Sequence, residues 1–74
     1  MRLINIAANL QEVHEGNTIK LFHYGALVCI IEDAKVIFTK DSRYSRTTTK
    51  HVKRFIDRHN LTFDEKAFQL IQPK

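Results

Sequence analysis

The sequence predicts a small α+β domain: an antiparallel β-meander of three to four strands, covered by one amphipathic helix and followed by a short C-terminal helix. Three observations support this fold class. The first half of the 74-residue chain alternates apolar and polar residues, or runs apolar over short stretches, as strands do. Its connections are short, which favours antiparallel neighbours. From residue 45 onward the apolar spacing becomes that of a helix.

Five short segments of the chain have the character of β-strands. They are residues 2–7, 10–14, 18–24, 27–31 and 35–39. Between the second and third segments, Gly16 and Asn17 both tolerate positive φ, which predicts a hairpin turn. The third segment alternates and places Ile19, Leu21 and His23 on one face. The fourth is apolar throughout, which predicts a central strand covered on both faces.

A long helix is expected after Ser45, whose hydroxyl can cap the free N–H groups of the first turn. One stripe of this helix comprises Thr48, Val52, Phe55, Ile56 and His59. The helix is expected to end near residues 59–60. A sheet with one face open to water is not stable alone, so this stripe should cover it. The sheet residues expected beneath the helix are Val28, Ile30, Ile37 and their neighbours.

A second, short helix is expected near the C-terminus. The sequence Thr62-Phe63-Asp64-Glu65 matches a capping box, which places the helix start at Thr62. The face expected to be buried comprises Phe63, Ala67, Leu70 and Ile71. Pro73 lacks the N–H that a helix needs and should end it. The sequence assigns no separate role to the segment from Leu61 to Lys74.

Composition excludes several classes of protein. With 43% hydrophobic residues the chain is too apolar to be disordered, and residues 1–74 are expected to form a single domain. The longest apolar run, residues 26–31, is far shorter than the roughly 20 residues of a membrane-spanning helix. Met1-Arg2 leads straight into a mixed polar segment, so we expect no secretory leader, and the sequence has one cysteine. We therefore expect no internal disulfide, no membrane partner and a cytoplasmic setting.

Positive charge is concentrated in one loop and one helix. Residues 40–58 hold seven basic and two acidic residues, a net charge of +5, whereas the rest of the chain carries −1. The helix cations lie opposite the apolar stripe, a distribution typical of a surface that binds phosphate backbone. A purely solvated outer face is the alternative, because every amphipathic helix needs one. The candidate nucleic-acid-binding residues are Arg43, Tyr44, Arg46, Thr47, Lys50, Lys53, Arg54 and Arg58.

No group of residues has the spacing of a catalytic or metal site. The four histidines include no His-x-x-x-His pair, although His14 and His23 lie where a hairpin would let them meet. His59, on the apolar stripe, is expected to be half-buried and to donate an N–H to a backbone carbonyl. Cys29 lies in the most apolar strand, where burial raises the pKa of a thiol and makes it unreactive. We therefore expect no enzyme, no metal ion and no cofactor.

Residues 24–28 are Tyr-Gly-Ala-Leu-Val, and residues 44–51 are Tyr-Ser-Arg-Thr-Thr-Thr-Lys-His. This pattern resembles a family of very short proteins encoded by tailed bacteriophages, with a Tyr-Gly or Tyr-Asn turn and a Tyr/Trp-Ser-x-Thr-Thr-x-x-His entry to a helix. The matching residues are Tyr24, Gly25, Tyr44, Ser45, Thr47, Thr48 and His51. The resemblance spans residues 18–59. It implies a phage product made in the cytoplasm of the infected bacterial host, with no settled activity.

The helix-entry motif has two interpretations. In the first it is structural: Tyr24 and Gly25 form a turn. Ser45 then caps the helix, Thr48 bonds into the sheet and His51 holds the incoming loop. In the second, the same hydroxyl groups present donors to a phosphate at the positive end of the helix.

Three functions follow as hypotheses. The leading one is a small phage accessory protein that binds nucleic acid through the basic helix without catalysis. The second is an inhibitor or adaptor that binds a host protein, such as a nucleic-acid enzyme or an anti-phage defence component, by charge complementarity. The third is a self-associating structural protein, in which residues 3–7 or 18–24 form an exposed edge strand that pairs in a homodimer.

Overall fold

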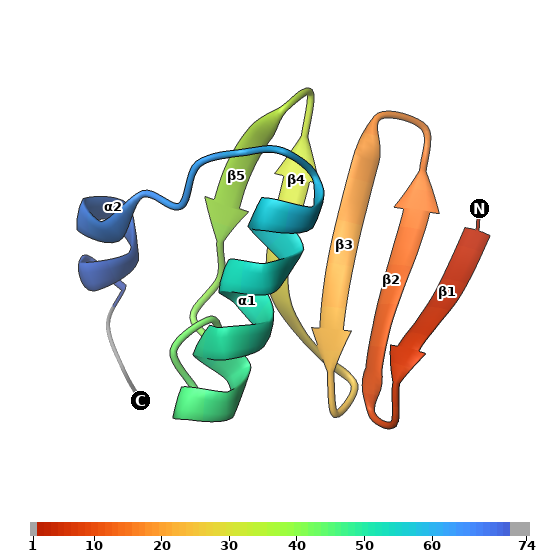
Figure 1. Cartoon of the computed structure of the whole chain (residues 1–74), viewed down its shortest axis with the longest axis horizontal. Coiled ribbons are helices and arrows are strands. Elements are labelled where there is room, and N and C mark those ends of the chain that lie inside the picture. The colour runs from red at the N-terminus through yellow and green to blue at the C-terminus, as the bar shows by residue number, and fades with distance from the viewer. Residues whose placement is uncertain (1, 72–74) are drawn as a thin grey trace.

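A computed structural model describes residues 2–71, which form one five-stranded sheet and two helices (Figure 1). The strands are β1 (Arg2–Ala7), β2 (Leu10–Glu15), β3 (Thr18–His23), β4 (Ala26–Glu32) and β5 (Lys35–Phe38), and the helices are α1 (Arg46–Arg58) and α2 (Glu65–Gln69). The strands pair antiparallel in chain order, so the sheet is a meander. The predicted α+β class is confirmed. The sheet has five strands rather than three to four because every extended segment pairs with the next.

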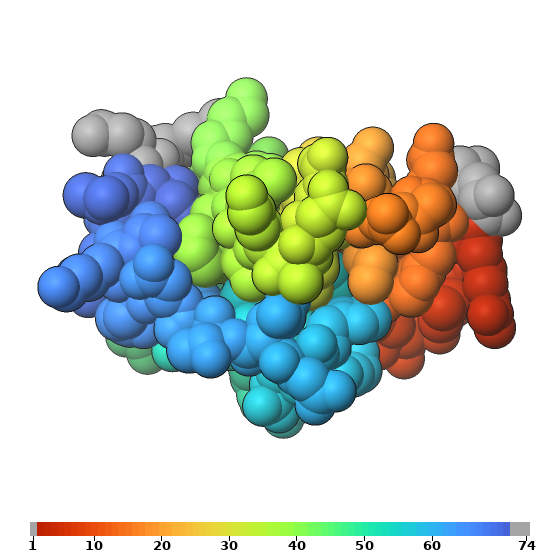
Figure 2. Space-filling model, turned by 90° about the horizontal axis from the view of Figure 1, so that it is seen from above, coloured from red at the N-terminus to blue at the C-terminus, as the bar shows by residue number. Residues whose placement is uncertain are grey.

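Helix α1 lies across one face of the sheet, over β3 and β4 (Figures 1 and 2). Its buried residues, Thr48, Val52, Phe55 and Ile56, are those of the predicted stripe. The sheet contributes Leu10, Leu21, Val28, Cys29 and Ile31 to the same core. Ile30 and Ile37, predicted beneath the helix, pair with each other and face away from it. That part of the prediction is wrong, because the strand register places Cys29 and Ile31 on the helix side.

The continuous apolar run of β4 contains a β-bulge. The pairing with β3 passes from Leu21↔Cys29 to Phe22↔Leu27, so Val28 is the extra residue. Val28 and Cys29 are consecutive, yet both are buried in the core beneath α1. Leu27 faces away from the core and is only partly buried. The run therefore reflects a bulge, and the prediction that both faces of this strand are covered is wrong.

Tight turns set the register of the strands. Gly16 adopts a φ of +60° in the predicted hairpin between β2 and β3. Tyr24 and Gly25 form the next turn, with φ values of +54° and +77°. Two successive positive φ values match the right-handed twist of the flanking strands, and the glycine adopts its value without strain. The turn leaves the Tyr24 side chain exposed beside the end of β3.

Strands β1 and β5 are the edges of the sheet. Strand β1 is exposed along most of its length, with Leu3 and Ile6 open to solvent. Strand β3 is hydrogen-bonded to β2 on one side and β4 on the other. The prediction that residues 18–24 offer a free edge is therefore wrong, and of the two predicted segments only residues 3–7 lie at an edge.

Two hydroxyl groups fix the loop that enters α1. The Thr39 hydroxyl donates a hydrogen bond to the Leu27 carbonyl at 2.7 Å, and the buried Ser42 hydroxyl donates to the Val28 carbonyl. The Ser42 oxygen also accepts from the Thr39 N–H at 2.9 Å. Because β5 ends at Phe38, it does not reach the bulge in β4. The two hydroxyl groups supply the hydrogen bonds that a neighbouring strand would otherwise give to the Leu27 and Val28 carbonyls.

The start of α2 differs from the prediction. Its N-cap is Asp64, whose carboxylate accepts hydrogen bonds from the Lys66 and Ala67 N–H groups at 3.1 and 3.2 Å. The predicted capping box that begins at Thr62 is wrong. Asp64, directly before the first residue of the helix, supplies the cap in place of Thr62. The predicted helix stop at Pro73 lies outside the described residues.

The C-terminal segment covers the end of β5. The rings of Phe63 and Phe68 pack against Phe38, with ring centroids 5.6 and 5.4 Å away. Phe68 is buried and Leu70 is exposed, so the predicted buried face of this helix is wrong at Leu70. The segment from Leu61 to Ile71 thus extends the apolar packing beyond α1. Within the described residues, neither helix is long and apolar enough to span a membrane.

Replacing Ser42 with alanine should lower the free energy of unfolding by about 1–3 kcal/mol, because the Val28 carbonyl and Thr39 N–H lose their partner. Equilibrium urea unfolding followed by circular dichroism measures the change. Thr62→Ala is the control, because Thr62 is exposed and Asp64 caps α2. Its stability should change by at most about 0.5 kcal/mol. Equal stability of the two variants would contradict the role of Ser42.

Candidate nucleic-acid interface

A chain of hydrogen bonds joins the N-terminus of α1 to the sheet. Ser45 is the N-cap, and its hydroxyl oxygen accepts from the Thr48 N–H at 3.1 Å. The Thr48 hydroxyl is 3.1 Å from that oxygen and 2.9 Å from Nδ1 of the buried His23. The predictions that Ser45 caps and that Thr48 bonds into the sheet are confirmed. The ring of His51 packs on the His23 ring at 4.9 Å, so it faces the end of β3.

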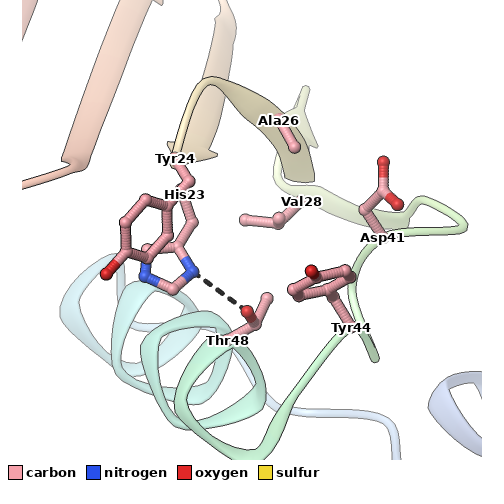
Figure 3. A pocket seen from close by; sticks show the side chains of 7 residues that line it. All are labelled: His23, Tyr24, Ala26, Val28, Asp41, Tyr44 and Thr48. Atoms are coloured by element: carbon pink, nitrogen blue, oxygen red, sulfur yellow. Dashed lines mark hydrogen bonds between the residues drawn. The ribbon is translucent and has the colours of Figure 1, made fainter.

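An open hollow of about 490 Å³ lies beside this chain of bonds (Figure 3). Its lining residues are His23, Tyr24, Ala26, Val28, Asp41, Tyr44 and Thr48. Tyr24 and Tyr44 stand on opposite sides of it, one from the β3–β4 turn and one from the loop before α1. Tyr24 is 71% exposed and Tyr44 is 77% exposed. The two tyrosines of the sequence motif are therefore brought together as exposed walls of one hollow.

Five of the six predicted basic residues fall into two groups, and the sixth, Arg58, belongs to a separate cluster. Arg46, Lys50 and Arg54 are exposed and four residues apart, so they form one stripe along α1, here called the basic stripe. Arg43 donates hydrogen bonds to backbone carbonyls of the C-terminal segment at 3.2 and 3.3 Å, and Lys53 lies 5.1 Å from the centre of the Phe63 ring. These last two cations therefore also hold the C-terminal segment.

His51 lies in α1 beside two cations of the basic stripe, which contribute to a shift of its pKa. The pKa of His51 lies below its ordinary value of 6.5. Burial is the main cause, followed by the like charges of His23, Arg54 and Lys50. Thr47 is exposed in the first turn of the same helix. The N-terminal half of α1 thus exposes cations and a hydroxyl, and its first turn borders the aromatic hollow through Thr48.

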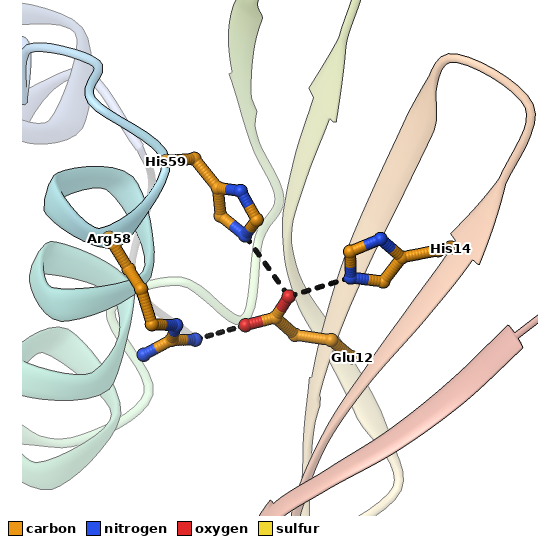
Figure 4. A network of polar contacts seen from close by, with 4 residues as sticks. All are labelled: Glu12, His14, Arg58 and His59. Atoms are coloured by element: carbon orange, nitrogen blue, oxygen red, sulfur yellow. Dashed lines mark hydrogen bonds and ion pairs between the residues drawn. The ribbon is translucent and has the colours of Figure 1, made fainter.

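A second polar cluster lies at the C-terminal end of α1 (Figure 4). Glu12, with a side chain only 4% exposed, accepts hydrogen bonds at Oε1 from Nε2 of His14 at 2.9 Å and of His59 at 3.0 Å. Its Oε2 accepts from the Arg58 guanidinium. Burial alone would raise the pKa of Glu12. The hydrogen bonds outweigh that effect and hold this pKa below its ordinary value of 4.5.

This cluster corrects three expectations. His59 is half-buried as predicted, but it donates to a carboxylate and not to a backbone carbonyl. His14 meets His59, at a ring-centroid distance of 5.9 Å, instead of His23. His14 is paired with Ile19 and not with His23, so the hairpin register keeps those two histidines apart. Arg58, predicted to contact nucleic acid, is already paired with Glu12.

Sequence reasoning missed Glu12. The signal was present in β2, where Leu10, Glu12 and His14 alternate on the face toward the core. A glutamate at an inward position requires a partner, because an isolated buried charge is costly. The partners come from the far end of α1, and spacing along the chain does not reveal them.

Cys29 carries no chemistry in this site. Its side chain is fully buried in the core, and burial raises the pKa of its thiol to about 12. A thiol in that state is neither a good nucleophile nor a ready metal ligand. The prediction that Cys29 acts as a buried hydrophobe is confirmed.

The fold and site define a small α+β protein with an exposed basic stripe beside a hollow flanked by two tyrosines. A family model described as "Family of unknown function (DUF8033)" matches residues 3–69, and the chain belongs to this family. The matched region includes the basic stripe, the hollow and the Glu12 cluster. No curated protein and no solved structure matches the chain.

Replacing Glu12 with glutamine should lower the free energy of unfolding by about 1–3 kcal/mol, since an uncharged amide pairs poorly with three N–H donors. Urea denaturation provides the measurement. Glu15→Gln is the matched control, because Glu15 is exposed on the same strand. If both variants unfold at the same urea concentration, Glu12 does not hold α1 to β2.

Proposed function

We propose that this protein binds single-stranded nucleic acid without catalysing a reaction. It would act as a small accessory protein of a tailed bacteriophage in the cytoplasm of the infected host. The observation that carries the proposal is that the hollow flanked by two exposed tyrosines lies at the end of α1 where the basic stripe begins, with Tyr44 two residues before Arg46. The phage setting rests on the resemblance of the Tyr-Gly turn and the helix-entry motif to short phage proteins.

The basic stripe supplies the affinity. Arg46, Lys50 and Arg54 are exposed on one line of α1, and Asp57 is the only acidic residue in that helix. A face that served solubility alone would mix charges of both signs. Cations spaced along a helix neutralise successive phosphates and release counterions, so the affinity should fall steeply with salt.

The tyrosines favour a single strand over a duplex. In a duplex the faces of the bases are stacked on one another and are closed to side chains. A base released from the stack could enter the hollow and lie against Tyr44 or Tyr24, whose rings are largely exposed. Arg46 and Thr47 follow Tyr44 closely in the chain, so the adjacent phosphate would meet the start of α1. Such binding tolerates many sequences, because every base has an aromatic face.

Charge reversal tests the stripe. The double variant Lys50→Glu/Arg54→Glu should bind a labelled single strand at least about tenfold more weakly, and the slope of log affinity against log salt should fall by about 2. Fluorescence anisotropy at about 50 and 200 mM salt measures both quantities. The control Lys35→Glu/Lys66→Glu changes the net charge equally at exposed positions outside α1. Equal losses in both double variants would mean that net charge, and not the stripe, drives binding.

Stacking is tested separately at Tyr44. Tyr44→Ala should weaken single-strand binding by about 1–3 kcal/mol and leave the salt slope unchanged, whereas Tyr44→Phe should bind like wild type because it keeps the ring. The same anisotropy titration gives both values. Unchanged binding by Tyr44→Ala, or tighter binding of duplex than of single strand, would contradict the role of the hollow. If no nucleic acid binds at low salt, the host-protein alternative replaces this proposal.

A further inference from the structure

We propose that Glu12, His14 and His59 bind a divalent transition-metal ion, with Zn²⁺ as the ion that fits best. One oxygen and two imidazole nitrogens converge there, and all three donor atoms lie within 4.8 Å of one another (Figure 4). They come from β2 and from the residue that ends α1. The cluster lies at the opposite end of α1 from the tyrosine hollow, so this inference does not depend on nucleic-acid binding.

The donor atoms have the right chemistry, and the two oxygen–nitrogen distances are close to those around a tetrahedral ion. Two imidazole nitrogens and one carboxylate oxygen form a ligand set that Zn²⁺ commonly takes. Donors at about 2.0–2.1 Å from a tetrahedral ion are about 3.3 Å apart. Glu12 Oε1 is now 2.9 Å from His14 Nε2 and 3.0 Å from His59 Nε2. A movement of a few tenths of an ångström would open these two distances to fit the ion, with each imidazole carrying its proton on Nδ1.

The surroundings allow entry of an ion and hold the carboxylate in place. The side chains of His14 and His59 are 32% and 22% exposed, so the cluster lies close to solvent, and a water could complete the coordination. Arg58 occupies the other oxygen of Glu12, so Oε1, which now faces the two imidazoles, would act as a single-atom ligand. The Arg58 side chain is 40% exposed, so the high dielectric constant of nearby water weakens the repulsion between its charge and the ion.

An ion at this site would join β2 to the end of α1. The chain has one cysteine, which is buried, so no internal disulfide performs this task. Small domains with limited cores commonly gain stability from a structural metal. Binding to the folded state alone would raise the melting temperature as the ion concentration increases.

The test is a titration of the full chain, first stripped with a chelator, with Zn²⁺ in a calorimeter. We expect one ion per chain and a higher melting temperature in its presence. Co²⁺ added in place of Zn²⁺ should give the visible absorption of a four-coordinate site.

His14→Ala should weaken Zn²⁺ binding at least tenfold and remove the shift in melting temperature. His51→Ala removes a histidine of α1 that packs on His23 and lies outside the cluster, so this variant should bind Zn²⁺ like wild type.

His14→Ala is the decisive variant, because His14 is the most exposed of the three ligands and its loss least endangers folding. Circular dichroism without metal establishes that it is folded, and His14→Gln serves in its place if it is not. Absence of a stoichiometric heat in the wild type would overturn the proposal. So would Zn²⁺ binding of equal strength in wild type and His14 variants, which would indicate ions held non-specifically elsewhere.

Discussion

The packing of α1 across β3 and β4 is the interaction on which the rest of this structure depends. The core comprises one stripe of that helix and the inward residues of the sheet, with Val52, Phe55 and Ile56 fully buried. Burial of this stripe is the dominant stabilising term available to a chain of this size. Polar contacts fix the helix at both ends. Thr48 bonds to the end of β3, and Glu12 in β2 holds the last turn.

The orientation of α1 also creates the surface that we assign to nucleic acid. Once the apolar stripe faces the sheet, the cations on the opposite side of the helix must face solvent. The loop fixed by Ser42 then places Tyr44 across the hollow from Tyr24. Not every cation is equally available, because Arg58 pairs with Glu12 and Arg43 binds the C-terminal segment. The proposed interface therefore includes fewer cations than the seven basic residues of residues 40–58.

Local features of the fold could be predicted from the sequence, and features that depend on register or on distant partners could not. The stripe of α1, its cap at Ser45 and the hairpin at Gly16 follow from periodicity and turn chemistry within a few residues. The bulge at Val28 has no local signal, because an apolar run looks the same with or without it. The Glu12 cluster joins residues that are far apart in the chain: Arg58 lies 46 residues and His59 lies 47 residues after Glu12. The sequence identified both tyrosines, but only the fold shows that they share one hollow.

The proposed nucleic-acid surface is best tested by a ¹H–¹⁵N NMR titration of the protein with a short single-stranded oligonucleotide. We expect the largest shift changes at Tyr24, at Tyr44 and along α1 from Arg46 to Arg54, with much smaller changes in β1. This result would place the strand across the hollow and the basic stripe. Shift changes confined to β1 or to the sheet face away from α1, or none at low salt, would show that nucleic acid does not bind at this surface.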